Sequence, residues 1–253
     1  MDSFCRGRLR ARMATGARDI ERAQRLRHRA FIAGRPAVRP RPSGRDADAF
    51  DLICRHLMLE EAASGALLGC FRILVLASGA EIHRSYSAQT YDLSRLEGYD
   101  RPMLEMGRFC IHPDHAGDPD VLRLAWAALA RVIDAEGVGL VFGCSSFHGA
   151  EVARHRPALA WLAARHLAPP RWRPRRKAPK AVPFARLAET RPDPQRAQRA
   201  LPPLLRSYLA MGGWVSDHAV VDDDLDTLHV FTGLEIAAIP PARARLLRAT
   251  AAA

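Results

Sequence analysis

The stretch LEMGRFCIHPDH, residues 104–115, predicts a strand that carries two charges in an apolar setting. Glu105 and Arg108 stand among apolar residues, with Gly107 between them. Side chains three positions apart on a regular strand point to opposite faces. A bulge at Gly107 would add one residue, bring both charges to one face and free a backbone N–H. The simpler alternative is a structural ion pair at the sheet edge.

The residues after this strand predict a helix and a second strand. In DPDVLRLAWAALARVIDAEG, Asp118 suits the N-cap and Gly137 the C-terminal end of a largely buried helix. The segment 139–147 then reads as a strand. A strand, a helix and a strand in this order indicate a parallel pair joined by a right-handed crossover.

The rest of the chain favours antiparallel strands. A helix is expected from Asp19, as its N-cap, to about Gly34, followed by a hairpin that turns near Ser64–Gly65. We therefore expect one mixed α/β domain over 1–253, a mostly antiparallel sheet with one parallel pair splayed at the bulge, and flanking helices. Further elements are expected at about 9–14 (strand), 150–166 and 201–211 (helices), and 216–236 (a hairpin turning at 222–226), with 168–199 a basic, Pro-rich insertion or loop.

Positive charge is concentrated in two segments. Residues 1–45 hold 13 arginines against three acids, and residues 168–186 hold seven basic residues and no acid. Such segments attract anionic partners, such as an acidic protein, a lipid headgroup or nucleic acid. With 36 Arg against two Lys, an Arg-rich composition alone is the plainer explanation of the total charge, but it does not explain the clustering.

Composition excludes several classes of protein. The chain is 48% hydrophobic, which suits a packed core, and its five cysteines form no CxxC pair, so neither a disulfide framework nor a zinc site is expected. No secretory signal or apolar span of about 20 residues is recognised, so a cytoplasmic protein is expected.

Other charged residues also occupy apolar segments. Asp48 and Asp51 precede the first hairpin strand, Arg72 interrupts GCFRILV, and Arg27 lies one turn before Phe31 on the first helix. Each by itself fits a solvated side chain. Together they suggest a constellation.

The ordered motifs LRxxxF, DxFD, LGxFRIL, LExGRFCIHP and VFGCSSF resemble the GNAT acyltransferase superfamily, in particular acyl-homoserine-lactone synthases and L-ornithine Nα-acyltransferases. The motifs GRFCIHP and FGCSSF, with LPPLLRSYLAMGGWV downstream, resemble the ornithine enzymes more than the homoserine-lactone synthases. The resemblance covers roughly residues 8–167 and 200–236.

The resemblance implies direct attack of an amine on a thioester held between the strands at 103–112 and 139–147. Glu105 would accept the proton, and Arg108 would help to order the catalytic site. Carried over in the same way, the residues that bind substrate or donor would be Arg27, Phe31, Asp48, Asp51, Arg72, Gly107, Phe109, Cys144, Ser145 and Ser146. Ornithine lipid synthesis, with a (3-hydroxy)acyl chain moved to the α-amine of L-ornithine, is the implied pathway.

The chemistry of these residue types is consistent with the mechanism that the resemblance implies. An α-ammonium must lose a proton before it attacks, and a buried carboxylate can accept it. Arginine binds carboxylates in a bidentate way, and backbone N–H groups at 106–109 could stabilise an oxyanion.

The donor expected is the 4'-phosphopantetheine thioester of acyl carrier protein, with no bound cofactor and no metal. Where acetyl-CoA-dependent relatives carry a Gly-rich pyrophosphate loop, this chain reads HAGDPD, with two aspartates that would repel a pyrophosphate. The basic segments would steer an acidic carrier protein, or hold the enzyme on anionic membrane at its inner face.

Alternatives remain open at this point. An acyl-homoserine-lactone synthase is the nearest, and a basic nucleic-acid-binding protein, with Trp172 stacking in RWRPRRKAPK, ranks lower because it leaves the constellation unexplained. A Cys110–His112 nucleophile is a further, weaker alternative. Acyl length, 3-hydroxylation, amino-acid choice and oligomeric state are left open.

Overall fold

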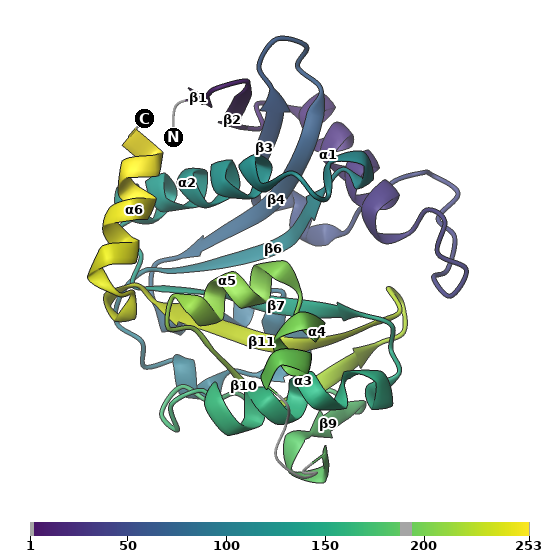
Figure 1. Cartoon of the computed structure of the whole chain (residues 1–253), viewed down its shortest axis with the longest axis vertical. Coiled ribbons are helices and arrows are strands. Elements are labelled where there is room, and N and C mark those ends of the chain that lie inside the picture. Colours follow the sequence, from purple (N-terminus) through teal and green to yellow (C-terminus); the bar gives the residue numbers. More distant parts are fainter. Residues whose placement is uncertain (1–2, 188–193, 253) are drawn as a thin grey trace. The chain divides into compact units, whose positions relative to one another are not determined.

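The computed structural model describes residues 3–187 and 194–252, and the chain divides into two compact units (Figure 1). The first comprises 1–75, 104–138 and 241–253, and the second comprises 76–103 and 139–240. Both units contain strands and helices. The expected mixed α/β class, with mostly antiparallel strands and flanking helices, is confirmed.

In the first unit, five strands follow the order β1-β2-β3-β4-β6. The expected hairpin is present as β3 and β4, which pair antiparallel, and Gly65 in its turn has φ +71°. Glycine tolerates this left-handed conformation at no steric cost. The strands of this unit are β1 (Phe4–Arg6), β2 (Leu9–Met13), β3 (Arg55–Glu61), β4 (Leu67–Leu76) and β6 (Met103–Ile111).

The helices of the first unit are α1 (Ala17–Phe31), α2 (Pro119–Glu136) and α6 (Pro241–Ala252). Asp118 caps α2 by accepting the N–H of Asp120 at 2.9 Å, and Gly137 ends it with φ +62°, both as predicted. The predicted N-cap of α1, Asp19, was wrong by three residues. Its N-cap is Gly16, and Asp19 lies in the first turn, where its carboxylate accepts the N–H of Thr15 at 3.1 Å.

In the second unit, four strands follow the order β7-β11-β10-β9 with antiparallel pairing. Since β6, α2 and β7 follow one another along the chain, they have the connection that the expected parallel pair requires. The elements of this unit are β5 (Tyr91–Asp92), β7 (Leu140–His148), α3 (Val152–Arg165), β8 (Arg175–Arg176), β9 (Ala181–Pro183), α4 (Pro194–Ala200), α5 (Pro203–Ala210), β10 (Trp214–Asp222) and β11 (Thr227–Glu235).

Two short strands and part of a helix occupy the segment that the sequence predicts as an insertion or loop. Within 168–199 lie β8, which pairs with β5, then β9, which pairs with β10, and the start of α4. Residues 188–193 of this segment lie outside the described part. Among the described helices, none is long and apolar enough to cross a membrane.

Candidate active site

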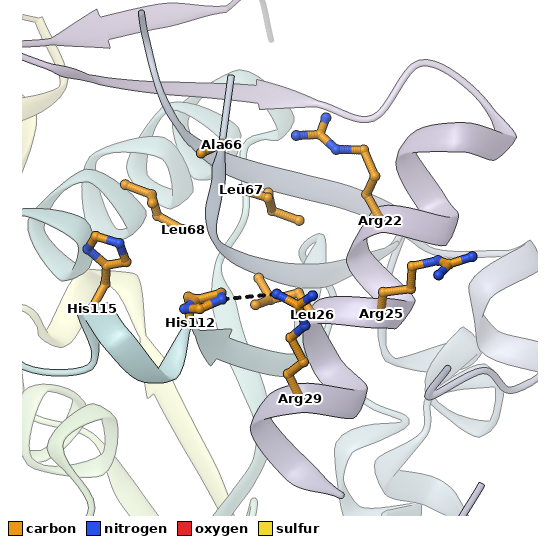
Figure 2. A pocket seen from close by; sticks show the side chains of 9 residues that line it. All are labelled: Arg22, Arg25, Leu26, Arg29, Ala66, Leu67, Leu68, His112 and His115. Carbon is orange, nitrogen blue, oxygen red and sulfur yellow. Dashed lines mark hydrogen bonds between the residues drawn. The ribbon is translucent and has the colours of Figure 1, made fainter. Parts of the chain in front are cut away.

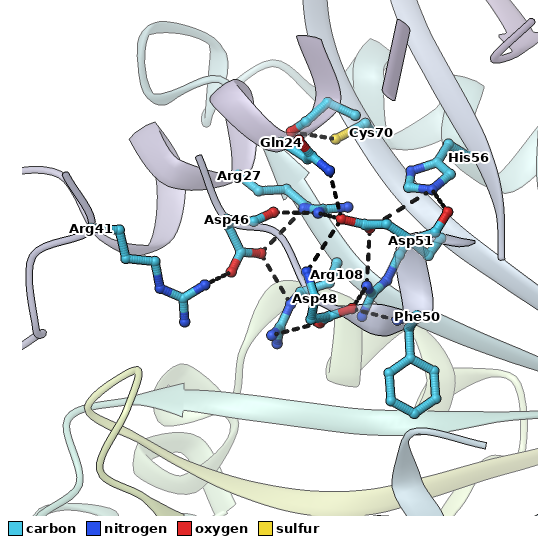
Figure 3. A network of polar contacts seen from close by, with 12 residues as sticks. Gln24, Arg27, Arg41, Asp46, Asp48, Phe50, Asp51, His56, Cys70 and Arg108 are labelled. Carbon is cyan, nitrogen blue, oxygen red and sulfur yellow. Dashed lines mark hydrogen bonds and ion pairs between the residues drawn. The ribbon is translucent and has the colours of Figure 1, made fainter. Parts of the chain in front are cut away.

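Three arginines and three aspartates of the first unit form one polar network (Figure 3). The arginines come from separate elements: one from α1, one from β4 and one from β6. All three aspartates come from the short segment before β3. The members are Arg27, Arg72, Arg108, Asp46, Asp48 and Asp51.

Asp46 connects two of these arginines. Its Oδ2 lies 3.2 Å from Nε of Arg27 and 3.1 Å from Nε of Arg108, while Oδ1 accepts from Arg41 at 2.6 Å. The Asp46 side chain is fully buried. A buried carboxylate needs such pairing, because an unpaired charge away from water is strongly destabilising.

A short 3-10 helix at Ala49–Leu52 positions the other two aspartates. Asp48 caps it by accepting the N–H of Phe50 at 2.9 Å, and the Asp51 side chain accepts the N–H of Asp48 in return. This reciprocal capping box fixes both carboxylates relative to the backbone. The sequence DAFD therefore defines the local structure that presents the acids to Arg27 and Arg72.

Arg27 is buried because its guanidinium reaches several acceptors. It lies 2.8 Å from Oδ2 of Asp51 and also donates to the backbone carbonyl of Asp46. Gln24, one turn earlier on α1, donates to the same Asp51 oxygen at 2.9 Å. The amphipathic helix thus supplies both groups from the face turned toward β3 and β4.

The network lowers the pKa of two of its acids, Asp51 and Asp48. Burial by itself raises the pKa of Asp51, but the hydrogen bond and charge of Arg27, helped by Gln24 and Arg72, outweigh it and lower the pKa to about 2. Burial also opposes ionisation of Asp48, whose pKa is nevertheless lowered by Arg72 and Arg108.

His56, on β3, contributes a neutral group to the network. Burial lowers the pKa of His56 below its usual value, so the ring is neutral at pH 7. Its Nε2 lies 3.3 Å from the backbone carbonyl of Asp51.

The irregularity in β6 falls on Arg108. Its φ is +53°, whereas Gly107 is outside the left-handed region, and a Cβ added at Gly107 would meet open space. The left-handed residue of β6 is therefore Arg108, the neighbour of the Gly107 at which the bulge is predicted. A left-handed non-glycine residue is strained, and the contacts of Arg108 with Asp46 and Asp48 hold it in place.

Glu105 is buried on β6, two residues before Gly107. Its charge reaches the region of the network, because it acts on Cys54 together with Arg72, Asp48 and Asp51. Burial is the main cause that raises the pKa of Cys54 to about 11, Arg72 lowers it, and Glu105 is the first of the acids that raise it further.

The chain is similar to known acyltransferases. Residues 26–127 match the acetyltransferase (GNAT) domain family. The L-ornithine N(alpha)-acyltransferase of Rhodobacter capsulatus is 37% identical over 230 residues, which cover 87% of this chain and 86% of that protein. The chain belongs to the L-ornithine Nα-acyltransferase family. It is therefore an acyltransferase.

A second curated acyltransferase and one solved structure are also similar to this chain. The L-ornithine N(alpha)-acyltransferase of Brucella abortus is 32% identical, with 91% of this chain and 85% of that protein covered. In three dimensions, a CoA-dependent acyl-homoserine lactone synthase, BjaI, solved with SAM and isopentyl-CoA, aligns with a TM-score of 0.50 at 15% identity, over 93% of this chain and 83% of that one. At that identity the likeness concerns the fold alone.

Eight of the residues expected for this family lie in two places. Asp48, Asp51, Arg27, Arg72 and Arg108 are brought together, as described above. Three others lie in the second unit, on β7: Cys144, whose Sγ is 3.5 Å from Oγ of Ser87; Ser145, buried and accepting from Thr232 at 2.9 Å; and Ser146, exposed.

Two aromatic residues of the prediction pack outside the ion-pair network. Phe31, at the end of α1, packs against a cluster that contains Leu26 and Met58. Phe109 lies with its ring centroid 5.8 Å from that of Phe71. Their expected roles toward substrate or donor stay predictions.

Sequence reasoning missed Asp46, Arg41, Gln24 and His56. Asp46 carried a weak signal, because DADAFD repeats the acid two positions before Asp48. Asp46 lies in the stretch 35–47, whose Pro, Arg and Gly content predicts a loop, where an acid is expected to be solvated. Its burial follows from the approach of Arg27 and Arg108, which sequence spacing does not reveal.

The Cys110–His112 alternative does not fit the geometry. The Sγ of Cys110 lies 3.6 Å from Sγ of Cys70, and the contact with Cys70, followed by burial, raises the pKa of Cys110 well above its usual value. His112 instead accepts the N–H of Asp114 at its Nδ1 atom, at 3.3 Å. A thiol with a raised pKa is a poor nucleophile.

Within 3–187 and 194–252, no three His, Cys, Asp or Glu side chains lie close enough together to hold a metal ion. The carboxylates of the network are instead paired with arginines.

Proposed function

We propose that this enzyme transfers a (3-hydroxy)acyl chain from acyl carrier protein to the α-amine of L-ornithine, giving lyso-ornithine lipid. The observation that carries the proposal is the 37% identity to an L-ornithine N(alpha)-acyltransferase across 87% of the chain. The site adds a chemical reason, because a zwitterionic amino acid needs both cations and anions at fixed positions.

The exposed part of the network suits such a substrate. The side chains of Asp48 and Arg108 are 26% and 13% exposed, whereas those of Arg27, Asp46, Asp51 and Arg72 are 5% exposed or less. In the proposal, Arg108 binds the ornithine carboxylate and Asp48 an ammonium group. The more buried residues then hold these two in position.

Glu105 is the proposed proton acceptor. The α-ammonium gives a proton to Glu105, directly or through a water, and the free amine attacks the thioester carbonyl. The tetrahedral intermediate collapses to an amide, and the carrier-protein thiolate leaves and takes up a proton. No acyl-enzyme is formed on this route.

The start of α2 supports a carrier-protein donor rather than CoA. The carboxylate of Asp118 occupies the helix N-terminus, accepting from Asp120 and pairing with Arg8. In enzymes that hold a pyrophosphate at such a terminus, backbone N–H groups face the anion. Here an aspartate fills that position, so a pyrophosphate would meet a negative charge.

The test mixes purified enzyme with 3-hydroxyacyl carrier protein or 3-hydroxyacyl-CoA and with a panel of amino acids and S-adenosylmethionine, and follows thiol release and product mass. We expect N-acylornithine with the carrier protein, and a loss of about 10²–10⁴-fold in Glu105→Gln. Turnover with CoA alone would contradict the donor assignment, and release of a lactone would indicate a homoserine-lactone synthase instead.

A further inference from the structure

A cavity of about 310 Å³ lies in the first unit, beside α1 (Figure 2). Its walls come from α1, from the start of β4 and from the residues that follow β6. The polar lining is entirely basic and the rest is aliphatic. The lining residues are Arg22, Arg25, Leu26, Arg29, Ala66, Leu67, Leu68, His112 and His115.

The arginines of the cavity differ in how they are paired. Arg22 lies 2.9 Å from Glu60, and Arg25 lies 2.7 Å from Glu21. Arg29 has no carboxylate partner among residues 3–187 and 194–252. Its nearest polar contact is Nε2 of His112, 3.3 Å from Nη1. Arg29, which is exposed to solvent, is therefore the arginine of this lining whose charge no carboxylate of the described residues compensates.

The contact between Arg29 and His112 leaves one donor without an acceptor. Nε2 of His112 lies 3.3 Å from Nη1 of Arg29, and Nδ1 lies 3.3 Å from the backbone N of Asp114. A neutral imidazole has a single acceptor nitrogen, so it cannot accept from both N–H groups. An anion in the cavity that accepts from Arg29 would relieve this conflict.

We propose that this cavity binds a phosphodiester group, and that in the reaction the group is the one joining the pantetheine arm to acyl carrier protein. Arg29 and His112 would donate to the phosphate oxygens, with Leu26 and Leu67 beneath the aliphatic part of the arm. The assignment to the donor rests on the proposed function. It also accounts for Asp118 at the start of α2, since the phosphate is then held by side chains rather than by helix N–H groups.

Binding of the probe is measured by calorimetry and needs no turnover. Wild-type enzyme is titrated with phosphopantetheine and with pantetheine, which differ only in the phosphate. We expect phosphopantetheine to bind about 10-fold or more tightly, as one or two charge-assisted hydrogen bonds provide. Equal affinity for the two probes would overturn the proposal.

Three variants test whether the preference for phosphopantetheine over pantetheine arises in this cavity. In Arg29→Gln and in His112→Asn, which keeps an acceptor for the N–H of Asp114, the preference for phosphopantetheine should fall to about twofold or less. Arg18→Gln removes the same charge from an exposed position of α1 outside the cavity, and should keep the preference. A preference that survives in both cavity variants would also refute the site.

Vesicle binding distinguishes the two sources of a phosphodiester, which are the arm of the carrier protein and a lipid headgroup. We would measure the binding of wild type and of Arg29→Gln to two kinds of vesicle. One contains phosphatidylglycerol and phosphatidylcholine, and the other contains phosphatidylcholine alone. Loss of vesicle binding in Arg29→Gln, with its phosphopantetheine preference unchanged, would assign the cavity to lipid and refute the donor assignment. Absence of acyl transfer to ornithine in wild type would refute the proposed function. Calorimetry would still decide whether the cavity binds phosphate.

Discussion

The Nε atom of Arg108 lies 3.1 Å from Oδ2 of Asp46, in a pair where the acid is fully buried. The same oxygen lies 3.2 Å from Nε of Arg27. One carboxylate therefore joins α1 to β6 and holds the left-handed backbone of Arg108. Asp46 is a positioning residue, since its contacts are with the arginines of the network.

Replacing Asp46 with Asn should destabilise the enzyme by about 3 kcal/mol, because the buried Arg27 and the largely buried Arg108 each lose one of their two paired carboxylates. We also expect kcat/KM to fall, since Arg108 is no longer held toward Asp48. Denaturant unfolding and steady-state kinetics measure the two effects. Asp114→Asn, an exposed acid, is the control and should change stability by less than about 0.5 kcal/mol. Equal stability of Asp46→Asn and wild type would contradict the role of Asp46.

Gly107→Ala should be tolerated, with a loss below about 1 kcal/mol. Its backbone is not left-handed, and an added Cβ would meet nothing within 4 Å. Gly69→Ala is the comparison, because its Cβ would lie 3.0 Å from the carbonyl of Cys110 and should cost about 1–3 kcal/mol. Thermal unfolding of both variants checks that Gly69→Ala loses more stability than Gly107→Ala. A larger loss for Gly107→Ala than for Gly69→Ala would show that the strand irregularity requires a glycine at 107.

Asp51 should make stability depend on acid pH. Its pKa falls from 3.8 to about 2 on folding, so its contribution is fully present above pH 4 and is lost as the pH falls through 2. The difference in unfolding free energy between wild type and Asp51→Asn should therefore shrink between pH 4 and pH 2. Urea unfolding across this range measures it. A difference that stays constant would show that Asp51 has the same pKa in both states.

Cys54 can report the charge of Glu105 without turnover. Because Glu105 raises the pKa of Cys54, Glu105→Gln should lower that pKa below about 11 and speed alkylation of Cys54 at alkaline pH. Mass spectrometry at this cysteine follows the rate. The exposed Cys5 in the same sample is the internal control, and its rate should not change. An unchanged rate at Cys54 would mean that Glu105 carries no charge there.

Local patterns predicted the elements better than their ends. Asp118, Pro119 and Gly137 define α2 through capping chemistry that acts within one turn, and the β3–β4 hairpin follows from its turn residues. The start of α1 was misplaced because Asp19 looks like an N-cap by residue type. In the structure its carboxylate instead receives Arg12 at 2.8 Å, a partner on β2.

The sequence by itself determined the fold class, the family and most members of the Arg–Asp network, because capping, turns and ordered motifs are properties of short segments. Tertiary structure alone decided that Asp46 lies between Arg27 and Arg108, and that the strained residue of β6 is Arg108 rather than Gly107. It also decided that Arg29 faces His112 with no carboxylate partner in the described part of the chain. These facts depend on which charges meet when α1, β4 and β6 come together. The free energy of a buried charge depends on its partners in space, which spacing along the chain does not contain.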